Sequence, residues 1–147
     1  MRVVDSDILS YALYDESPAH ELAWRLVERG VLGEIDLHIT PITVLETYNV
    51  LYHFYRVRPL TRLLEKLTLV VESLKVIDAS MEGLGIAARE NIPLGDGFLI
   101  ATALKHRMPV VVTNDAHILG KASKYGLIAE NPITEEVRGK LSSWKID

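Results

Sequence analysis

The sequence of 147 residues contains no cysteine. Disulfide bonds and thiolate metal sites are therefore excluded, and any metal ion would need oxygen or imidazole ligands. The chain also lacks an uninterrupted apolar run of about 18 residues, so we expect no membrane-spanning helix. It begins directly with a predicted strand rather than with a basic segment before an apolar stretch, so we expect no signal peptide. Together these absences predict a soluble, cytoplasmic protein with no membrane partner.

Basic residues are outnumbered as well, with 16 Lys and Arg against 20 Asp and Glu and a net charge of −4. Such a chain is not expected to hold nucleic acid by bulk electrostatic attraction. A nucleic-acid substrate stays compatible with this charge if bound cations supply local positive charge. Hydrophobic residues at 48% and charged residues at 24% are normal for a globular protein, and the length predicts one domain over residues 1–147.

Short apolar runs, the clearest of them β-branched, alternate along the chain with segments of helical periodicity. This alternation predicts βαβ units, and therefore an α/β fold built on a parallel sheet with right-handed crossovers. The expected strands are residues 2–4, 37–39, 75–77, 110–112 and 127–129. The expected helices are residues 8–14, 18–30, 42–55, 59–71, 81–91, 97–106, 116–125 and 133–141.

Four acidic residues share one position in this pattern. Each lies shortly after a predicted strand or near the start of a predicted helix, where strand C-termini and helix N-termini meet. Ligands of open α/β sheets bind at this edge. The four residues are Asp5, Glu46, Asp96 and Asp115.

Each of these acids also has a purely structural interpretation. Asp96 and Asp115 are natural helix N-caps, and Asp5 could cap the first helix in competition with its neighbours. Glu46 fits an S/T-x-x-E capping box with Thr43, although the Thr40-Pro41 pair favours an earlier helix start. By contrast, Asp78 follows a strand within an ordinary capping sequence, and we interpret it as structural.

The acids are more informative as a group. Carboxylates that converge without Lys or Arg partners repel one another, and this repulsion raises their pKa values. A hard divalent cation removes that cost, and Mg²⁺ in particular takes few protein carboxylates, keeps water and binds phosphate. This donor set is typical of metal-assisted phosphoester hydrolysis. The histidines form neither H-x-x-x-H nor HExxH, so no zinc site is expected.

Two further groups remain open between a structural and a functional interpretation. The tyrosines Tyr48, Tyr52 and Tyr55 are expected in the core or at an interface rather than as platforms for nucleobases. The basic stretch from Arg56 to Lys66 forms either a solvated face or a rim that faces RNA.

Four segments in register resemble the PIN-domain family, and most closely its VapC type, the toxin half of toxin–antitoxin pairs. They are residues 3–9, 41–46, 94–103 and 111–115, and the resemblance covers nearly the whole chain. It implies a three-layer α/β/α fold with a five-stranded parallel sheet. It also implies RNA cleavage that depends on Mg²⁺ or Mn²⁺, a homodimer, and a small antitoxin partner. The apolar helices between Pro41 and Val71 would suit such interfaces.

The resemblance also assigns roles to individual residues. The four acids match the catalytic and metal-binding quartet, with Asp5 and Asp96 on the principal metal and the other two completing the site directly or through water. Thr113 matches a hydroxyl residue two positions before the last acid. Ser6 and Asp7 are expected to support the site, although Asp7 stands where the family more often has Asn or Ser. The quartet is Asp5, Glu46, Asp96 and Asp115.

Two other functions remain as alternatives. The Asp5-Ser6-Asp7 sequence after a strand resembles haloacid-dehalogenase-type phosphatases, in which the first Asp is the nucleophile. Their late acidic motif needs a second acid close behind, and Asp96 is followed only by Gly and apolar residues. The other alternative is a non-catalytic PIN-like module that binds RNA or acts as a scaffold, and the intact acid set argues against it. A Rossmann domain is not expected, because no GxGxxG follows the first strand.

Overall fold

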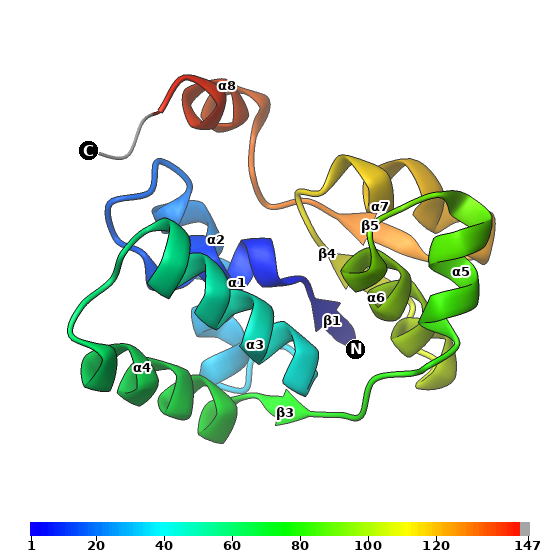
Figure 1. Cartoon of the computed structure of the whole chain (residues 1–147), viewed down its shortest axis with the longest axis horizontal. Coiled ribbons are helices and arrows are strands. Elements are labelled where there is room, and N and C mark those ends of the chain that lie inside the picture. Colours follow the sequence, from blue (N-terminus) through cyan, green and yellow to red (C-terminus); the bar gives the residue numbers. More distant parts are fainter. Residues whose placement is uncertain (145–147) are drawn as a thin grey trace.

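The computed structural model describes residues 1–144, which form a five-stranded parallel sheet covered by helices (Figure 1). The last three residues of the predicted 1–147 domain lie outside the described part of the chain. The sheet order is β3-β2-β1-β4-β5, with parallel pairing throughout. The strands are β1 (Arg2–Val4), β2 (Leu37–Ile39), β3 (Lys75–Val76), β4 (Val110–Val112) and β5 (Ile128–Glu130). The chain leaves β1 toward β2 and later returns to β4 on its other side, so the topological switch point lies between β1 and β4.

The two central strands bury alternate side chains on opposite faces of the sheet. Val3 and Val111 pack against α5 (Gly83–Glu90), α6 (Leu94–Lys105) and α7 (Ala116–Lys121). Val4 and Val112 pack against α1 (Ser6–Leu13), α2 (His20–Val31) and α4 (Leu60–Ser73). All four valines are fully buried, and each contributes roughly 1.5–3 kcal/mol of hydrophobic stabilisation. The two helix groups on either side of the sheet confirm the predicted three-layer α/β/α architecture (Figure 1).

The helix α3 (Pro41–Asn49) begins with a capping box that leaves Glu46 free. The Thr40 hydroxyl accepts the N–H of Thr43 at 3.1 Å, and the Thr43 hydroxyl accepts the N–H of Thr40 at 3.3 Å. The alternative box between Thr43 and Glu46 is therefore wrong, because Pro41 already occupies the first helical position. The glutamate lies beyond the first turn, where it has no capping role.

The predicted helix 42–55 is divided, because α3 passes into a π-helix over Val50–Phe54. In this π turn Leu51 is fully buried against Leu63 and Leu67 of α4. Packing on α4 therefore sets the backbone here rather than helical periodicity. The aromatic rings of Tyr48 and Tyr52 stack with centroids 5.4 Å apart beside this cluster, in the predicted core or interface position.

The helix α6 begins at Leu94, earlier than predicted, so the N-cap interpretation of Asp96 is wrong. Asn91 adopts the left-handed conformation at φ 54° and ends α5. The N–H groups of Asp96 and Gly97 then both bond to the carbonyl of Pro93, which closes the first turn of α6. Asp96 is thus inside the first turn, and no side chain caps this helix.

Other element ends differ modestly from the predictions. The predicted start of the second helix at Ser17 and Pro18 is a turn in which the Ser17 hydroxyl accepts the N–H of Ala19. The chain ends with the 3₁₀ turn Ala122–Tyr125, then β5, then α8 (Glu135–Ser143). Within residues 1–144, no helix has the length and apolar character needed to cross a bilayer.

Candidate active site

The four predicted acids meet at the C-terminal edge of the sheet, around the switch point. Asp5 directly follows β1, and Asp115 lies at the start of α7 just after β4. Glu46 comes from α3 and Asp96 from the first turn of α6. Their negative charges act on one another: after burial itself, the charges of the other acids are what raise the pKa of Asp96 and of Glu46. The structure therefore brings all four carboxylates into one site.

The Asp5 carboxylate is held by two hydrogen bonds. Its Oδ1 accepts the N–H of Ser6 at 2.8 Å, which makes Asp5 the N-cap of α1, and its Oδ2 accepts the Thr113 hydroxyl at 2.7 Å. The side chain is only 8% exposed. Burial raises the pKa of Asp5 to about 6, although the hydrogen bonds from Thr113 and Ser6 act in the opposite direction. The capping role and the site role therefore coincide in one residue.

Thr113 links two of the acids. It is fully buried, donates its hydroxyl to Asp5, and accepts the N–H of Asp115 at 2.9 Å. The carboxylate of Asp115 in turn caps α7, since its Oδ1 accepts the N–H of His117 at 2.8 Å. The predicted capping role of Asp115 is thus confirmed, and the loop between β4 and α7 ties it to Asp5.

Asp96 has a buried carboxylate oxygen without a hydrogen-bond partner among residues 1–144. The residue is 7% exposed, and the oxygen is its Oδ2. Burial, followed by the charges of Asp115 and Asp5, raises the pKa of Asp96 to about 8. A buried acceptor without a donor is costly, so this oxygen needs either a proton or a cation.

Glu46 approaches the backbone at the start of α6. A Cβ atom on Gly95 would lie 2.2 Å from Glu46 Oε2, so only a residue without a side chain allows this contact. Burial raises the pKa of Glu46, the charge of Asp5 raises it further, and hydrogen bonding from Ser6 acts in the opposite direction. Ser6 thus donates its N–H to Asp5 and opposes the rise in the pKa of Glu46.

Asp7 uses both carboxylate oxygens on backbone donors. Its Oδ1 accepts the N–H of Ile8 at 2.7 Å, and its Oδ2 accepts the N–H of Asn114 at 3.0 Å. Burial, and then the charge of Asp5, raises the pKa of Asp7 well above its usual value. The Asn114 side chain accepts a further hydrogen bond from Asn131 Nδ2 at 2.9 Å. The predictions missed the roles of both asparagines, although Asn131 directly follows a strand end, as Asp5 does.

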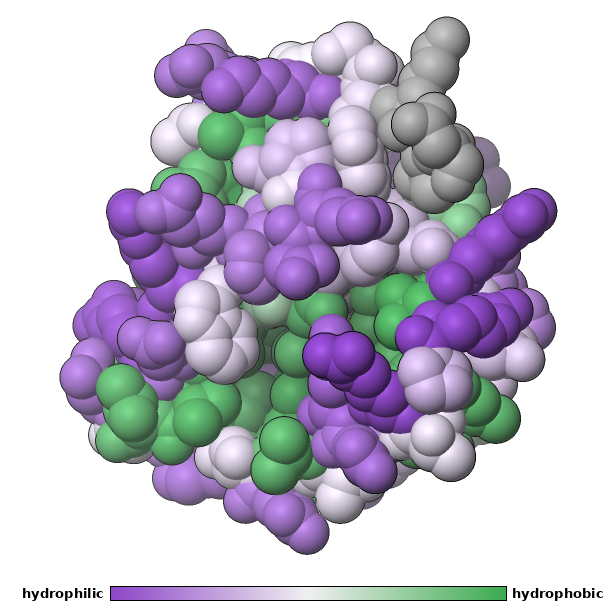
Figure 2. Space-filling view, turned by 90° about the vertical axis from the view of Figure 1, so that its left-hand side faces the viewer, coloured by the Kyte–Doolittle hydropathy of each residue, from purple (hydrophilic) through white to green (hydrophobic). Residues whose placement is uncertain are grey.

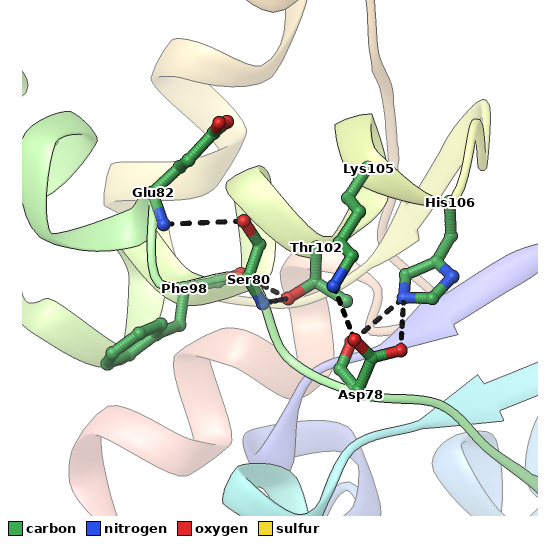
Figure 3. Close-up of polar contacts among 7 residues, drawn as sticks. All are labelled: Asp78, Ser80, Glu82, Phe98, Thr102, Lys105 and His106. Atoms are coloured by element: carbon green, nitrogen blue, oxygen red, sulfur yellow. Dashed lines mark hydrogen bonds and ion pairs between the residues drawn. The ribbon is translucent and has the colours of Figure 1, made fainter.

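A polar cluster on the loop before α5 fixes the position of α6 (Figure 3). The N–H of Ser80 donates to the Thr102 hydroxyl at 3.1 Å, and that hydroxyl donates to the carbonyl of Phe98 at 2.6 Å. Asp78 pairs with Lys105 and lies 3.2 Å from Nε2 of His106. The interpretation of Asp78 as structural agrees with these contacts, which hold the helix that carries Asp96.

The donor set of the site consists of oxygen atoms. Within residues 1–144, no three acidic or histidine side chains are already spaced to hold one metal ion together. Mg²⁺ needs only one or two protein carboxylates and completes its shell with water and phosphate, so this arrangement fits it. The unpartnered Oδ2 of Asp96 and the raised pKa values of Asp5 and Asp96 indicate a site that lacks positive charge.

Comparisons with solved structures show the same fold in known proteins. The chain resembles PAE2754 from Pyrobaculum aerophilum, with 23% identity and a TM-score of 0.63 over 97% of both chains. It also resembles a toxin-antitoxin complex from Klebsiella pneumoniae, with 18% identity and a TM-score of 0.59 over 90% of this chain and 98% of that one. VapBC2 from Rickettsia felis, bound to a DNA fragment from its promoter, has 16% identity and a TM-score of 0.60 over 88% of this chain and 97% of that one. At these identities the likeness shows the fold alone.

A comparison of the sequence with models of protein families identifies the family. No curated protein matches the chain significantly. The family model described as PIN domain matches residues 2–124, a stretch that contains all four acids of the site. The chain therefore belongs to the PIN domain family.

Proposed function

We propose that this chain is an endoribonuclease that hydrolyses RNA phosphodiester bonds with Mg²⁺ or Mn²⁺, as the cytoplasmic toxin of a toxin–antitoxin pair. The observation that carries the proposal is the convergence of four carboxylates that have no Lys, Arg or His ion-pair partner within residues 1–144. Membership of the PIN domain family supports a nuclease. The toxin–antitoxin complexes among the similar structures support the toxin role.

Each residue would have a defined task in this reaction. Asp5 and Asp96 would hold the principal cation, and Glu46 and Asp115 would complete the site directly or through water. The bound cation would supply Lewis acidity toward a water molecule and compensate charge on the scissile phosphate. The chain itself keeps Asp5 in place through Thr113 and presents the N-termini of α1 and α6, which favour the phosphate.

The substitutions Asp5→Asn and Asp96→Asn test the proposal. Each removes a charge at nearly constant shape, so we expect loss of Mn²⁺-dependent RNA cleavage with an unchanged circular dichroism spectrum. The matched control is Asp36→Asn, which removes an acid that pairs with Lys75 just before β2, at the opposite edge of the sheet from the site. Wild-type cleavage by either site variant would contradict the assignment. Parallel assays on single-stranded DNA test the preference for RNA.

The two alternatives predict different results in the same assays. A phosphatase would turn over a small phosphomonoester rapidly and would accumulate an aspartyl phosphate at Asp5. A scaffold module would leave RNA uncut and would show no thermal shift with Mn²⁺. Family membership and the unpaired acids favour the nuclease over both.

An apolar hollow distant from the acids would suit the antitoxin. It lies between α1, α2 and α4 and has a volume of about 430 Å³. These helices face the viewer in Figure 2, where green apolar surface lies among purple hydrophilic residues. We expect an amphipathic segment of a short partner protein, encoded by an adjacent reading frame, to dock there. Leu69→Glu should then prevent inhibition by that partner without changing RNA cleavage. The hollow is lined by Ala12, Leu13, Asp15, His20, Trp24, Val31, Lys66, Leu69, Val70 and Ser73.

A neighbouring apolar face would suit the homodimer. Exposed Leu45, Leu64 and Val71 lie along a second hollow formed by α3 and α4. Burial of these side chains in a second copy would remove apolar surface from water. Leu45→Lys should convert the dimer to a monomer in light scattering, whereas a wild-type protein that is itself monomeric would contradict the dimer.

A further inference from the structure

We infer that Asn131, at the exit of β5, is a positioning residue for Asp115, and that Asp7 holds the same loop through its backbone. The inference rests on the proposed function, because it concerns how the chain presents one of the proposed metal ligands. It gives the C-terminal segment a role in the site, although that segment contributes none of the four acids.

The loop from Thr113 to Asp115 is fixed at successive residues. The Thr113 hydroxyl binds Asp5, and the backbone N–H of Asn114 donates to Asp7 at 3.0 Å. The side chain of Asn114 has other partners: its Oδ1 accepts Nδ2 of Asn131 at 2.9 Å, and its Nδ2 lies 3.5 Å from the Tyr11 hydroxyl. Asn114 is therefore held by its backbone and by its side chain, and because it directly precedes Asp115, its position determines the position of Asp115.

Asp7 holds the loop through its carboxylate. Both of its carboxylate oxygens accept backbone N–H groups, from Ile8 at 2.7 Å and from Asn114 at 3.0 Å. An Asn side chain could still accept the Asn114 N–H through its carbonyl oxygen, although its Nδ2 would then face the N–H of Ile8. The carboxylate at position 7 therefore acts as a hydrogen-bond acceptor for the loop.

Asn131 can hold the loop because its own side chain is fixed. Its Oδ1 accepts the N–H of Ile133 at 3.0 Å while its Nδ2 donates to Asn114. Ile133 is 3% exposed and packs in the core cluster that contains Val4 and Ile8. A path of hydrogen bonds thus runs from the core through Asn131 to Asn114, which directly precedes Asp115.

The substitution Asn131→Ala tests this role. It removes the donor to Asn114, the residue before Asp115. Loss of a direct partner of a metal ligand typically weakens metal binding by about 10–100-fold, and Asn131 acts one residue further from the metal. We therefore expect the Mn²⁺ concentration for half-maximal binding, measured by calorimetric titration, to rise by up to about 10-fold. The matched control is Thr134→Ala in the same segment, which removes the N-cap of α8 but no contact with Asn114. Thr134→Ala should lower the melting temperature and leave the Mn²⁺ midpoint unchanged.

Two further measurements separate positioning from general destabilisation. If Asn131 acts through Asn114, adding Asn131→Ala to Asn114→Ala should change the Mn²⁺ midpoint no further. Asp7→Ala should raise the midpoint more than Asp7→Asn, because only the Asn side chain keeps an acceptor for the N–H of Asn114. An equal effect of Asn131→Ala and Thr134→Ala, or additive effects at positions 114 and 131, would overturn the inference.

The inference can also be distinguished from the proposed function. A wild-type protein that binds no Mn²⁺ would refute the proposed function. In that event the amide hydrogen exchange of Asn114 in metal-free protein, followed by NMR, still decides the positioning role. Faster exchange in Asn131→Ala than in Thr134→Ala supports the role, and equal exchange overturns it.

Discussion

The carboxylate of Glu46 lies against the backbone of Gly95, so closely that a Cβ atom there would stand 2.2 Å from Oε2. These residues come from different helices, α3 and α6, which meet at the edge of the sheet. The absence of a side chain at position 95 thus lets an acid of one helix approach the first turn of the next. The glycine is required by this contact rather than by its own backbone angles.

Gly95→Ala should therefore move Glu46 and impair the reaction without unfolding the protein. A displacement of about 1 Å at a catalytic group can cost about 100-fold in rate, and we expect a loss of that order in Mn²⁺-dependent RNA cleavage. Thermal denaturation should show a stable protein. The matched control is Gly85→Ala in α5, where a Cβ would meet no atom within 4 Å. That variant should be more stable by about 0.5–1 kcal/mol and fully active, and equal activity of the two variants would contradict the prediction.

The stability of the metal-free protein should fall as the pH rises. The folded-state pKa of Asp96 is about 8, raised mainly by burial and then by Asp115 and Asp5, against a usual value of 3.8. The folded state therefore binds more protons than the unfolded state across this range. The contribution of this carboxyl to stability is fully present below pH 3.8 and is lost as the pH rises toward 8. Asp5, with a pKa raised to about 6, acts with the same sign.

The substitution Asp96→Asn removes a carboxyl that contributes strongly to this pH dependence of stability. In EDTA at pH 8, the variant should be more stable than the wild type by at least about 1 kcal/mol, since each pKa unit by which the folded protein raises the pKa of Asp96 above 3.8 corresponds to about 1.4 kcal/mol. Urea denaturation at several pH values measures the difference. Mn²⁺ should restore the wild type at high pH and leave the variant unchanged. Parallel stability curves for both proteins would show that Asp96 titrates normally.

The contact between Ser80 and Thr102 predicts a purely structural effect (Figure 3). Thr102→Val keeps the shape of a fully buried side chain but leaves the N–H of Ser80 without an acceptor. An unsatisfied buried donor costs about 1–3 kcal/mol, which urea denaturation would detect. Thr68→Val is the matched control, because that exposed hydroxyl only donates to the carbonyl of Leu64 in its own helix. If both variants lose the same stability, the loop contact contributes nothing of its own.

The sequence predicted the sheet and the convergence of the acids for identifiable reasons. The three β-branched residues Val110–Val112 specify a buried strand, and acids that follow parallel strands must gather at the same edge. Thr40 and Pro41 likewise predicted the start of α3, because a hydroxyl cap and a proline at the first helical position are local signals.

What the sequence could not predict depends on contacts between distant segments. The start of α6 at Leu94 follows from hydrogen bonds to the carbonyl of Pro93, which an Asp N-cap signal at Asp96 obscures. The π turn before Tyr55 follows from packing on α4. The pairing of Asn131 with Asn114 joins two loops that only the sheet order makes adjacent. Such features carry no periodic signal, so propensity and spacing do not reveal them.

Thr113 offers the sharpest test of how the site is held together. Its hydroxyl donates to Asp5 and accepts from the N–H of Asp115, so one buried group fixes two acids at once. Thr113→Val removes both bonds at constant shape, and Thr113→Ser keeps both. We expect the Val variant to lose about 10–100-fold in Mn²⁺ affinity, as is typical for residues that orient metal ligands, and the Ser variant to stay close to the wild type. Calorimetric titration with Mn²⁺ measures both. Equal binding by the two variants would mean that Asp5 and Asp115 keep their positions without the hydroxyl, because burial of their surroundings is then sufficient to hold them.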